Sequence, residues 1–233
     1  MAFVSLATVA GCNGNPEGPE GILESLESAF RKADAGAVLM LVDQGYLDML
    51  GGRGRLEDDL RQMFAVYGRM KLRHERPLNE ENLLESVIYL RGDGFSYTGP
   101  LRLELARQGN SWYVVSGLLE IPRGIIDTLR ERRLGLEEGD IGRFMRILSE
   151  DYKGPSGGRG QLIERLERDI KEGPRRALIV ERLEIEADHE KARVQQKYLL
   201  ILGLGKDKTE IRDTELLELR YQASRWRITG GLG

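Results

Sequence analysis

An internal repeat is the feature that most restricts the fold of this chain. The stretch Gly51-Gly52-Arg53-Gly54 recurs as Gly157-Gly158-Arg159-Gly160. Other pairs at the same offset of about 106 residues are Asp34 with Asp140, Gly36 with Gly142, Tyr46 with Tyr152 and Leu56 with Leu162; nearer the C-terminus the offset grows to about 114, where Trp112 matches Trp226 and Gly117 matches Gly231. A repeat of about one hundred residues is too long for a solenoid unit and has the size of a small domain. We therefore expect two related domains, 21–121 and 122–233, behind an N-terminal segment of residues 1–20.

The second copy carries extra residues, since its offset to the first copy increases along the chain. Insertions are tolerated best in turns, because one added strand residue turns every following side chain to the opposite face of the sheet. We expect the extra length in the hairpins near Asp188 and at 206–208.

The composition is that of a globular protein, with 40% hydrophobic and 31% charged residues. The net charge of -3 gives no reason to expect nucleic acid as a partner, because phosphate binding depends on a concentrated basic surface. Cys12 is the only cysteine, which excludes an intrachain disulfide and a thiolate metal site. We expect neither a metal nor another cofactor.

The position of this cysteine points to the cell envelope. Residues 1–10 form a short apolar run, and the sequence Val9-Ala10-Gly11-Cys12 resembles the lipobox of bacterial lipoproteins. The resemblance implies a lipid on Cys12 and attachment to a membrane, with residues 13–20 as a tether rich in Gly, Pro and Asn. Asn13 is similar to the residue that follows the cysteine in lipoproteins on the periplasmic face of the outer membrane. The alternative is a disordered N-terminus with an incidental cysteine.

The order of elements predicts an α+β fold in each copy. Apolar residues at helical spacing predict three helices in the first copy, near 22–32, 38–45 and 56–67, and alternation predicts strands at 71–78, 83–91, 101–108 and 112–119. The second copy repeats the order, with helices near 125–138, 141–149 and 161–172 and strands near 176–185, 191–202, 209–221 and 225–229. Helices followed by a run of antiparallel strands are typical of α+β domains. We expect Asp34 and Asp140 to cap the second helix of each copy.

One motif follows the expected second helix of the second copy: Glu150-Asp151-Tyr152-Lys153-Gly154-Pro155-Ser156-Gly157, with Gln44-Gly45-Tyr46-Leu47-Asp48 as its weaker counterpart in the first copy. With this motif, the sequence resembles the nuclear transport factor 2-like superfamily. The resemblance implies three helices packed on a curved four-stranded antiparallel sheet, with a ligand cone between them. The superfamily includes ketosteroid isomerases, scytalone dehydratases and domains without catalytic activity, so the fold does not select a function.

A catalytic site in this cone would use Tyr46, Asp48 and His74, a hydroxyl, a carboxylate and an imidazole suited to acid–base chemistry. Asp48 has no acidic counterpart, because Gly154 stands in the second copy. A structural interpretation competes at each position. The tyrosine can pack at a helix corner, and the histidine can be a partly exposed strand residue.

Tyr152, Trp112 and Trp226 are the candidates for ligand contact, although large aromatic side chains more often anchor a core. Three hypotheses remain. The first is a non-enzymatic, membrane-anchored module that binds a small apolar ligand or an envelope protein. The second is a small-molecule isomerase, dehydratase or hydrolase. The third is a structural role, in a monomer whose two sheets pack together as an intramolecular pseudo-dimer.

Overall fold

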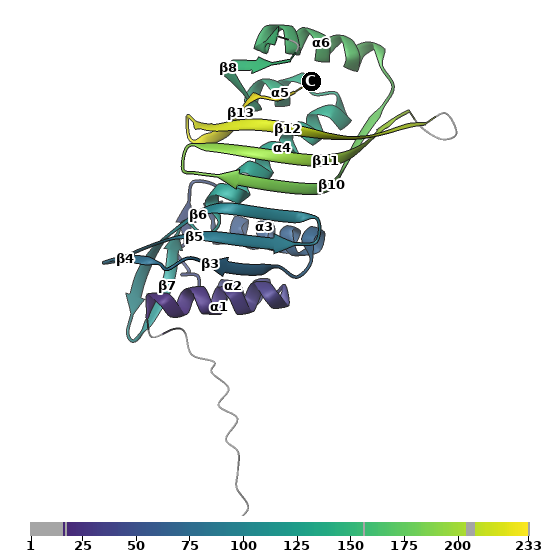
Figure 1. Cartoon of the computed structure of the whole chain (residues 1–233). Coiled ribbons are helices and arrows are strands. Elements are labelled where there is room, and N and C mark those ends of the chain that lie inside the picture. The colour runs from purple at the N-terminus through teal and green to yellow at the C-terminus, as the bar shows by residue number, and fades with distance from the viewer. Residues whose placement is uncertain (1–15, 17, 156, 204–207, 233) are drawn as a thin grey trace, which may run out of the picture.

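The computed structural model describes residues 16, 18–155, 157–203 and 208–232 of the 233-residue chain. Cys12, most of the expected tether, and residues 206–207 of the expected insertion therefore lie outside the described residues. The described residues form two halves with the same order of elements (Figure 1).

The first half contains α1 Pro19–Lys32, α2 Ala35–Met40, β1 Leu47–Asp48, β2 Gly51–Gly52, α3 Arg53–Tyr67, β3 Lys71–His74, β4 Leu78–Glu80, β5 Leu83–Gly92, β6 Phe95–Gln108 and β7 Ser111–Ser116. The second half contains α4 Glu120–Glu138, α5 Ile141–Ile147, β8 Leu148–Gly154, β9 Gly157–Gly158, α6 Arg159–Glu172, β10 Arg176–Ala187, β11 Lys191–Leu202, β12 Thr209–Gln222 and β13 Arg225–Gly230.

The repeated residues occupy equivalent places in the two halves. Asp34 and Asp140 are the N-caps of α2 and α5, and their carboxylates accept from the backbone N–H groups of Ala37 and Arg143 at 2.9 and 3.3 Å, as expected. Each Gly-Gly pair forms the short strand that leads directly into α3 or α6. The glycine repeat therefore lies between two helices, as the sequence predicted, but it forms a short strand and the start of the next helix.

Strands β1 and β2 form a separate two-stranded sheet, and the other strands of the described residues join into one sheet of 11 strands. Its path is β3-β5-β6-β10-β11-β12-β13-β8-β9, with β4 beside β5 and β7 beside β6. Within each half the long strands pair antiparallel. The halves meet where β6 pairs parallel with β10, over residues 95–98 and 183–186 (Figure 1). The α+β class is confirmed, and the parallel seam is a feature that the sequence pattern did not predict.

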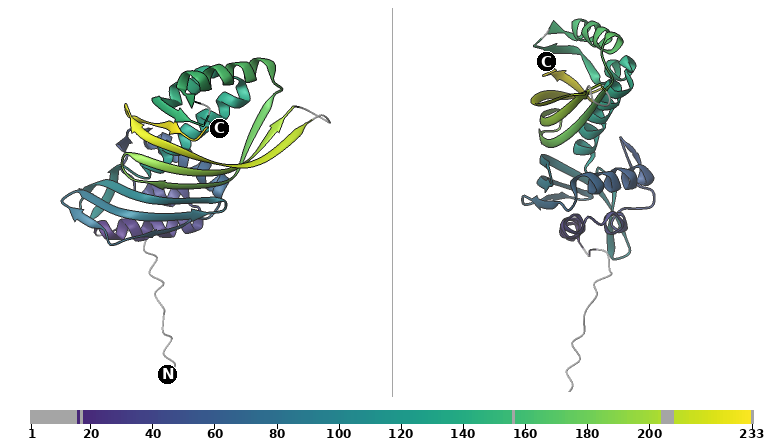
Figure 2. Two further views of the ribbon diagram at one scale, coloured as in Figure 1. Left: turned by 45° about the horizontal axis from the view of Figure 1, so that its top comes forward. Right: turned by 90° about the vertical axis from the view of Figure 1, so that its right-hand side faces the viewer.

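Helix α4 carries the connection between the halves. It begins at Glu120, five residues before the expected start, and Pro122 is tolerated in its first turn because the N–H groups there have no helical partner. The helix packs against α5, β10, β13 and β6, and so spans the seam (Figure 2). No separate linker stands between the two halves.

Two strand boundaries also differ from the pattern. The expected strand 71–78 is divided into β3 and β4, because Pro77 has no N–H for the ladder. Strand β6 begins at Phe95 instead of residue 101, since Phe95 and Tyr97 continue the buried alternation of Leu101 and Leu103. This earlier part of β6 is the segment that forms the seam.

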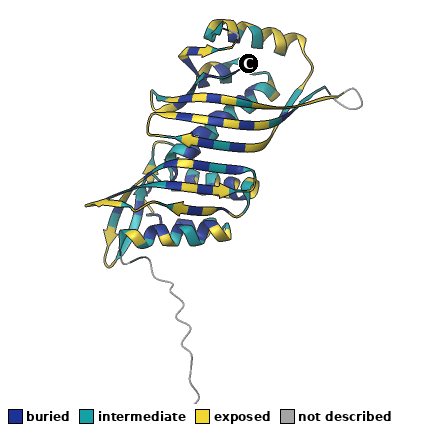
Figure 3. Cartoon of the chain, in the orientation of Figure 1, coloured by how far each residue is buried: buried dark blue, intermediate teal, exposed yellow. Residues whose placement is uncertain are grey.

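The inner face of the sheet is largely apolar, and buried and exposed residues alternate along the strands (Figure 3). In the first half, residues of α1 and α3 pack into it and are fully buried; they include Ile22, Leu26, Leu56 and Leu60. One continuous cluster of buried side chains runs through both halves.

Candidate functional site

Tyr46 and Asp48 lie together beneath the turn that follows α2. The Tyr46 side chain is buried, and its hydroxyl donates to Asp48 Oδ2 at 2.5 Å and accepts from the Leu118 backbone N–H at 3.1 Å. Asp48 Oδ1 accepts from the backbone N–H groups of Leu50 and Gly51 at 2.9 and 3.0 Å. The structure thus brings two of the predicted candidates into hydrogen-bond contact.

Arg123 of α4 completes this buried network. Its guanidinium lies 2.6 Å from Asp48 Oδ2 and 2.8 Å from Asp59 Oδ2, and the side chains of Arg123 and Asp48 are 1% and 0% exposed. The local sequence pattern did not indicate Arg123 as part of a site. The available signal was a single charged residue within an apolar segment, Ile121 to Ile125, where a buried cation needs a counter-charge.

The network has little capacity for acid–base catalysis. Both oxygens of Asp48 already accept hydrogen bonds, two from backbone groups and two from Tyr46 and Arg123. Burial, reinforced by the hydrogen bond to Asp48, raises the pKa of Tyr46 far above its ordinary value, so the phenol stays protonated. The arrangement links the turn after α2 to the first turn of α4, across the two halves of the chain.

Tyr152 has the equivalent position in the second half. Its hydroxyl accepts from the backbone N–H of Leu232 at 3.2 Å and donates to the carbonyl of the same residue at 2.9 Å. Leu118 and Leu232 each follow a glycine with positive φ, Gly117 at 86° and Gly231 at 93°. The repeated tyrosine therefore holds the chain where it leaves the last strand of each half.

His74 lies elsewhere in the first half. It shares the inner face of the sheet with Leu72, but its Nε2 is 3.7 Å from a carboxylate oxygen of Glu27 in α1, and its Nδ1 is 2.7 Å from the Glu75 carbonyl. The hydrogen bonds of Tyr46 and Asp48 do not include it. The three candidates do not form one hydrogen-bonded set.

The two tryptophans have different surroundings. Trp112 is half-buried, and its backbone N–H donates to the Pro16 carbonyl at 3.2 Å. Trp226 is 3% exposed, and its ring stands edge-on to Tyr221 with 5.7 Å between centroids. Gly124 of α4 permits this packing, because a Cβ there would lie 2.9 Å from the indole ring.

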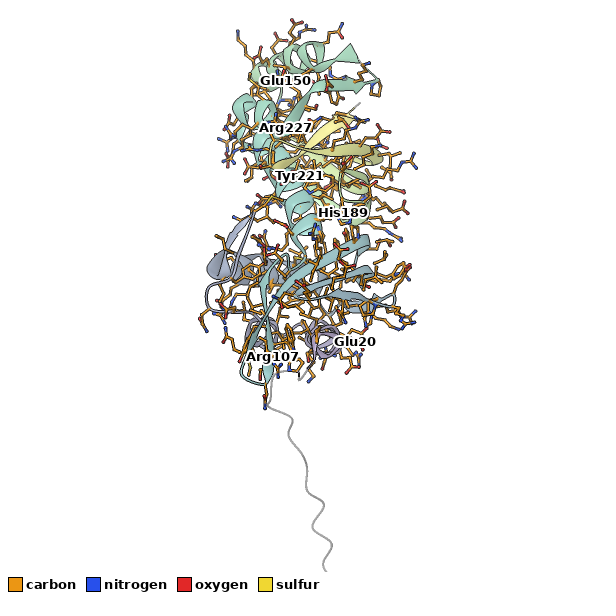
Figure 4. The ribbon with its side chains drawn as sticks, turned by 90° about the vertical axis from the view of Figure 1, so that its left-hand side faces the viewer. Glu20, Arg107, Glu150, His189, Tyr221 and Arg227 are labelled. Atoms are coloured by element: carbon orange, nitrogen blue, oxygen red, sulfur yellow. The ribbon has the colours of Figure 1, made fainter. Side chains whose placement is uncertain are left out.

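Trp226 also lines a cavity of about 500 Å³ between the two halves. The cavity opens where β6 runs past the end of β10, and its walls come from the β1–β2 turn, β6, α4, α5 and the hairpins of the second half. Figure 4 shows His189 and Tyr221, two of the lining residues, near the level at which the halves meet. The other lining residues are Met49, Leu50, Pro100, Leu101, Arg102, Gly117, Glu120, Ile121, Gly124, Asp127, Thr128, Glu131, Arg146, Ile147, Ser224, Arg225 and Trp226.

The wall beside Trp226 combines apolar and acidic groups. The Tyr221 hydroxyl lies 2.8 Å from Met49 Sδ, and one oxygen of Glu120 accepts from the Met49 backbone N–H at 2.8 Å. Burial raises the pKa of Glu120, and the nearby Asp48 carboxylate adds to the shift, against the hydrogen bond from Met49 and the positive charge of Arg123. A cavity of this size and mixed lining suits a small organic molecule.

The inner face of the second half differs from that of the first half. Arg132 of α4 makes a paired contact with Glu215 of β12 at 2.5 and 2.9 Å, beside the buried Gln196. The corresponding positions of the first half hold Leu26 and Leu101. This pair was not predicted from the sequence, although Arg132 and Glu215 stand where the first copy has two leucines.

Within the described residues, no group of three or more His, Cys, Asp or Glu side chains is arranged to hold a metal ion. No helix in that part of the chain combines the length and the apolar character needed to cross a membrane.

Comparison with known proteins gives matches to structures only. No protein-family model and no curated protein sequence matches the chain. A candidate dehydratase of the NTF2-like family from Streptomyces avermitilis is 9% identical, with a TM-score of 0.44, over 47% of this chain and 92% of the other. An NTF2-like superfamily protein from Salmonella enterica is 12% identical, with a TM-score of 0.41, over 46% and 84% of the two chains. A protein of unknown function with a cystatin-like fold from Nostoc punctiforme is 11% identical, with a TM-score of 0.41, over 46% and 85%. Each of these structures matches about half of this chain.

Proposed function

We propose that this chain is a non-enzymatic binding module of a bacterial envelope, held at the membrane by a lipid on Cys12, with its binding site in the cavity between the two halves. The observation that carries the proposal is the burial and full hydrogen bonding of the Asp48 carboxylate. Its side chain is fully buried and accepts four hydrogen bonds, so it has no position left for a substrate proton. The conspicuous polar cluster supports the junction between the halves, and the cavity beside it supplies room for a ligand.

The cavity can be tested by blocking it. Ile121 lines the cavity, and a larger side chain in Ile121→Trp would fill part of it. The matched control is Met40→Trp, at a site on α2 that is 62% exposed. In a thermal-shift screen of small apolar and amphipathic molecules, we expect ligands that stabilise the wild type and Met40→Trp but not Ile121→Trp. The proposed site would be contradicted if no molecule in the screen stabilised the wild type, or if the ligands found still stabilised Ile121→Trp.

The alternative is an isomerase, dehydratase or hydrolase that uses Tyr46, Asp48 and His74 of the first half. Turnover of a small molecule that disappears in Tyr46→Phe or His74→Ala, with the variants still folded, would establish this alternative. We expect no such turnover, because the hydrogen bonds of Tyr46 and Asp48 already serve the fold.

The lipid anchor is tested separately from the cavity. In cells fed a labelled fatty acid, we expect label on the wild-type protein and none on Cys12→Ala. A free Cys12 thiol in protein isolated from its native membrane would rule the anchor out.

We also propose a monomer, with the two halves related as an intramolecular pseudo-dimer. Strands β6 and β10 would each present an open edge in a separate half, and here they cover each other over residues 95–98 and 183–186. Light scattering of the purified chain should give the mass of one copy. A concentration-independent dimer would contradict this expectation.

A further inference from the structure

Glu120 is the carboxylate in the cavity wall that forms no ion pair among the described residues. The carboxylate lies in the first turn of α4 and is half-buried, and one of its oxygens accepts from the Met49 N–H. The N-terminus of the helix stabilises a negative charge to a limited extent. Among the residues that the structure describes, no Lys or Arg forms an ion pair with Glu120; the buried Arg123 lowers its pKa from farther away, but the Arg123 guanidinium is held by Asp48 and Asp59.

The other carboxylates of the cavity are already paired. Asp127 contacts Arg55 at 2.8 Å and Arg130 at 2.6 Å. Glu131 contacts Arg143 at 2.9 Å and Arg146 at 3.7 Å. The acidic wall of α4 is thus neutralised along its length except at its first residue.

The arginines that line the cavity do not supply the missing charge. Arg102 is 58% exposed and lies 3.3 Å from Glu85, while Arg146 is 54% exposed and is directed toward Glu131. Arg225 is exposed on the β12–β13 hairpin. Exposed cations are screened by solvent and salt, so a half-buried carboxylate gains little from them.

The surfaces near Glu120 suit the apolar body of a ligand. Ile121 follows it in α4, and Trp226 and Tyr221 form an aromatic wall of the same cavity. Aromatic rings and a carboxylate together are the groups that bind organic cations in proteins. A neutral or anionic ligand would leave Glu120 without an ion-pair partner.

We propose that the cavity binds an organic cation with an apolar body, such as an aryl-alkyl amine, with its ammonium group toward Glu120 and its body against Trp226 and Ile121. This inference rests on the proposed binding function of the cavity and names the chemical class of its ligand.

Three probes of similar shape test the inference: phenethylamine, phenethyl alcohol and phenylpropionate. The chain has two tryptophans, so Trp112→Phe leaves Trp226 as the only one, and its fluorescence reports on the cavity. We expect the amine to bind about tenfold more tightly than the alcohol and the acid to bind least. Glu120→Gln should weaken the amine about tenfold and leave the alcohol unchanged. The matched control is Glu24→Gln, on an exposed position of α1, which should change neither affinity.

The outcomes separate this inference from the proposed function. If the alcohol or the acid binds as well as the amine, or if Glu120→Gln leaves amine affinity unchanged, the cationic class is wrong while the cavity remains a binding site. If none of the three probes changes the Trp226 signal, the inference also fails. If Ile121→Trp retains the full response to the amine, the cavity itself is not the site.

Discussion

The buried ion pair between Arg123 and Asp48 should hold the two halves of the chain together. Arg123 belongs to α4, and Asp48 and Asp59 belong to the first half, so the contact crosses the junction. We predict that Arg123→Met, which keeps an apolar side chain of similar reach, lowers the free energy of unfolding and weakens the coupling between the halves.

The magnitude follows from the contacts that remain. Removing one partner of a buried ion pair costs about 3 to 5 kcal/mol, because the other charge is left without compensation. Here Asp48 keeps its hydrogen bonds from Tyr46, Leu50 and Gly51 at 2.5 to 3.0 Å, and Asp59 keeps Arg55 at 3.0 Å. The expected loss is therefore near the lower limit, about 3 kcal/mol.

Urea denaturation measures this loss. Far-ultraviolet circular dichroism follows the whole chain, and fluorescence of single-tryptophan variants follows Trp112 in the first half and Trp226 in the second half. In the wild type the two probes should report one transition, because the sheet and the buried core continue across both halves. In Arg123→Met the two midpoints should separate.

A matched control and a double mutant complete the test. Arg130→Met removes a partly exposed pair with Asp127 on the same helix and should cost less than about 1 kcal/mol. Adding Asp48→Asn to Arg123→Met removes the stranded charge, so the double mutant should be about 2 kcal/mol more stable than the sum of the single changes predicts. The reasoning is refuted if Arg123→Met costs no more than Arg130→Met.

Three further predictions concern the junction and the ends of the strands. Gly117→Ala should destabilise the chain by about 3 kcal/mol or more, because φ is 86° and a Cβ would lie 2.0 Å from the Arg102 carbonyl oxygen. The control Gly109→Ala, with φ of 62° and open space around the Cβ, should cost about 1 kcal/mol. Equal melting temperatures of the two variants would contradict this prediction. Tyr152→Phe should lower the free energy of unfolding by about 1 to 3 kcal/mol in urea denaturation, since the Leu232 N–H and carbonyl both lose their partner. An unchanged midpoint would show that the Tyr152 hydroxyl does not stabilise the chain end. Burial raises the pKa of Glu120 in the folded state, so the native protein binds this proton more strongly than the unfolded chain, and its contribution makes stability fall as pH rises from the ordinary glutamate pKa through the raised value. Glu120→Gln should remove that part of the pH dependence and gain stability relative to the wild type across this window; parallel stability profiles of the two proteins would disprove it.

The repeat in the sequence was sufficient to predict most of the local structure. Periodicity and turn residues are local properties, so the helices, the hairpins and the caps Asp34 and Asp140 could be placed without knowledge of the tertiary fold. The errors have local causes too. Pro77 divides a strand, and a helix whose first turn contains Pro122 begins earlier than its apolar pattern indicates.

The candidate site could be predicted only in part. Tyr46 and Asp48 are two residues apart, and the structure joins them by a hydrogen bond. Arg123 is 75 residues from Asp48, and nothing in the local pattern indicates that contact. His74 shares a sheet face with apolar residues, but its partner Glu27 comes from a helix that only packing brings near.

The sequence by itself indicated a repeat of two copies, with helices before strands in each copy, because repeats and periodicity are present in the order of the residues. Only the tertiary structure decided how the copies meet. Backbone pairing of β6 with β10 depends on exposed strand edges and not on side-chain identity, so one continuous sheet leaves no signal in the sequence. The cavity beside that seam, with Glu120 in its wall, exists because β10 ends there while β6 continues, and α4 packs against both strands.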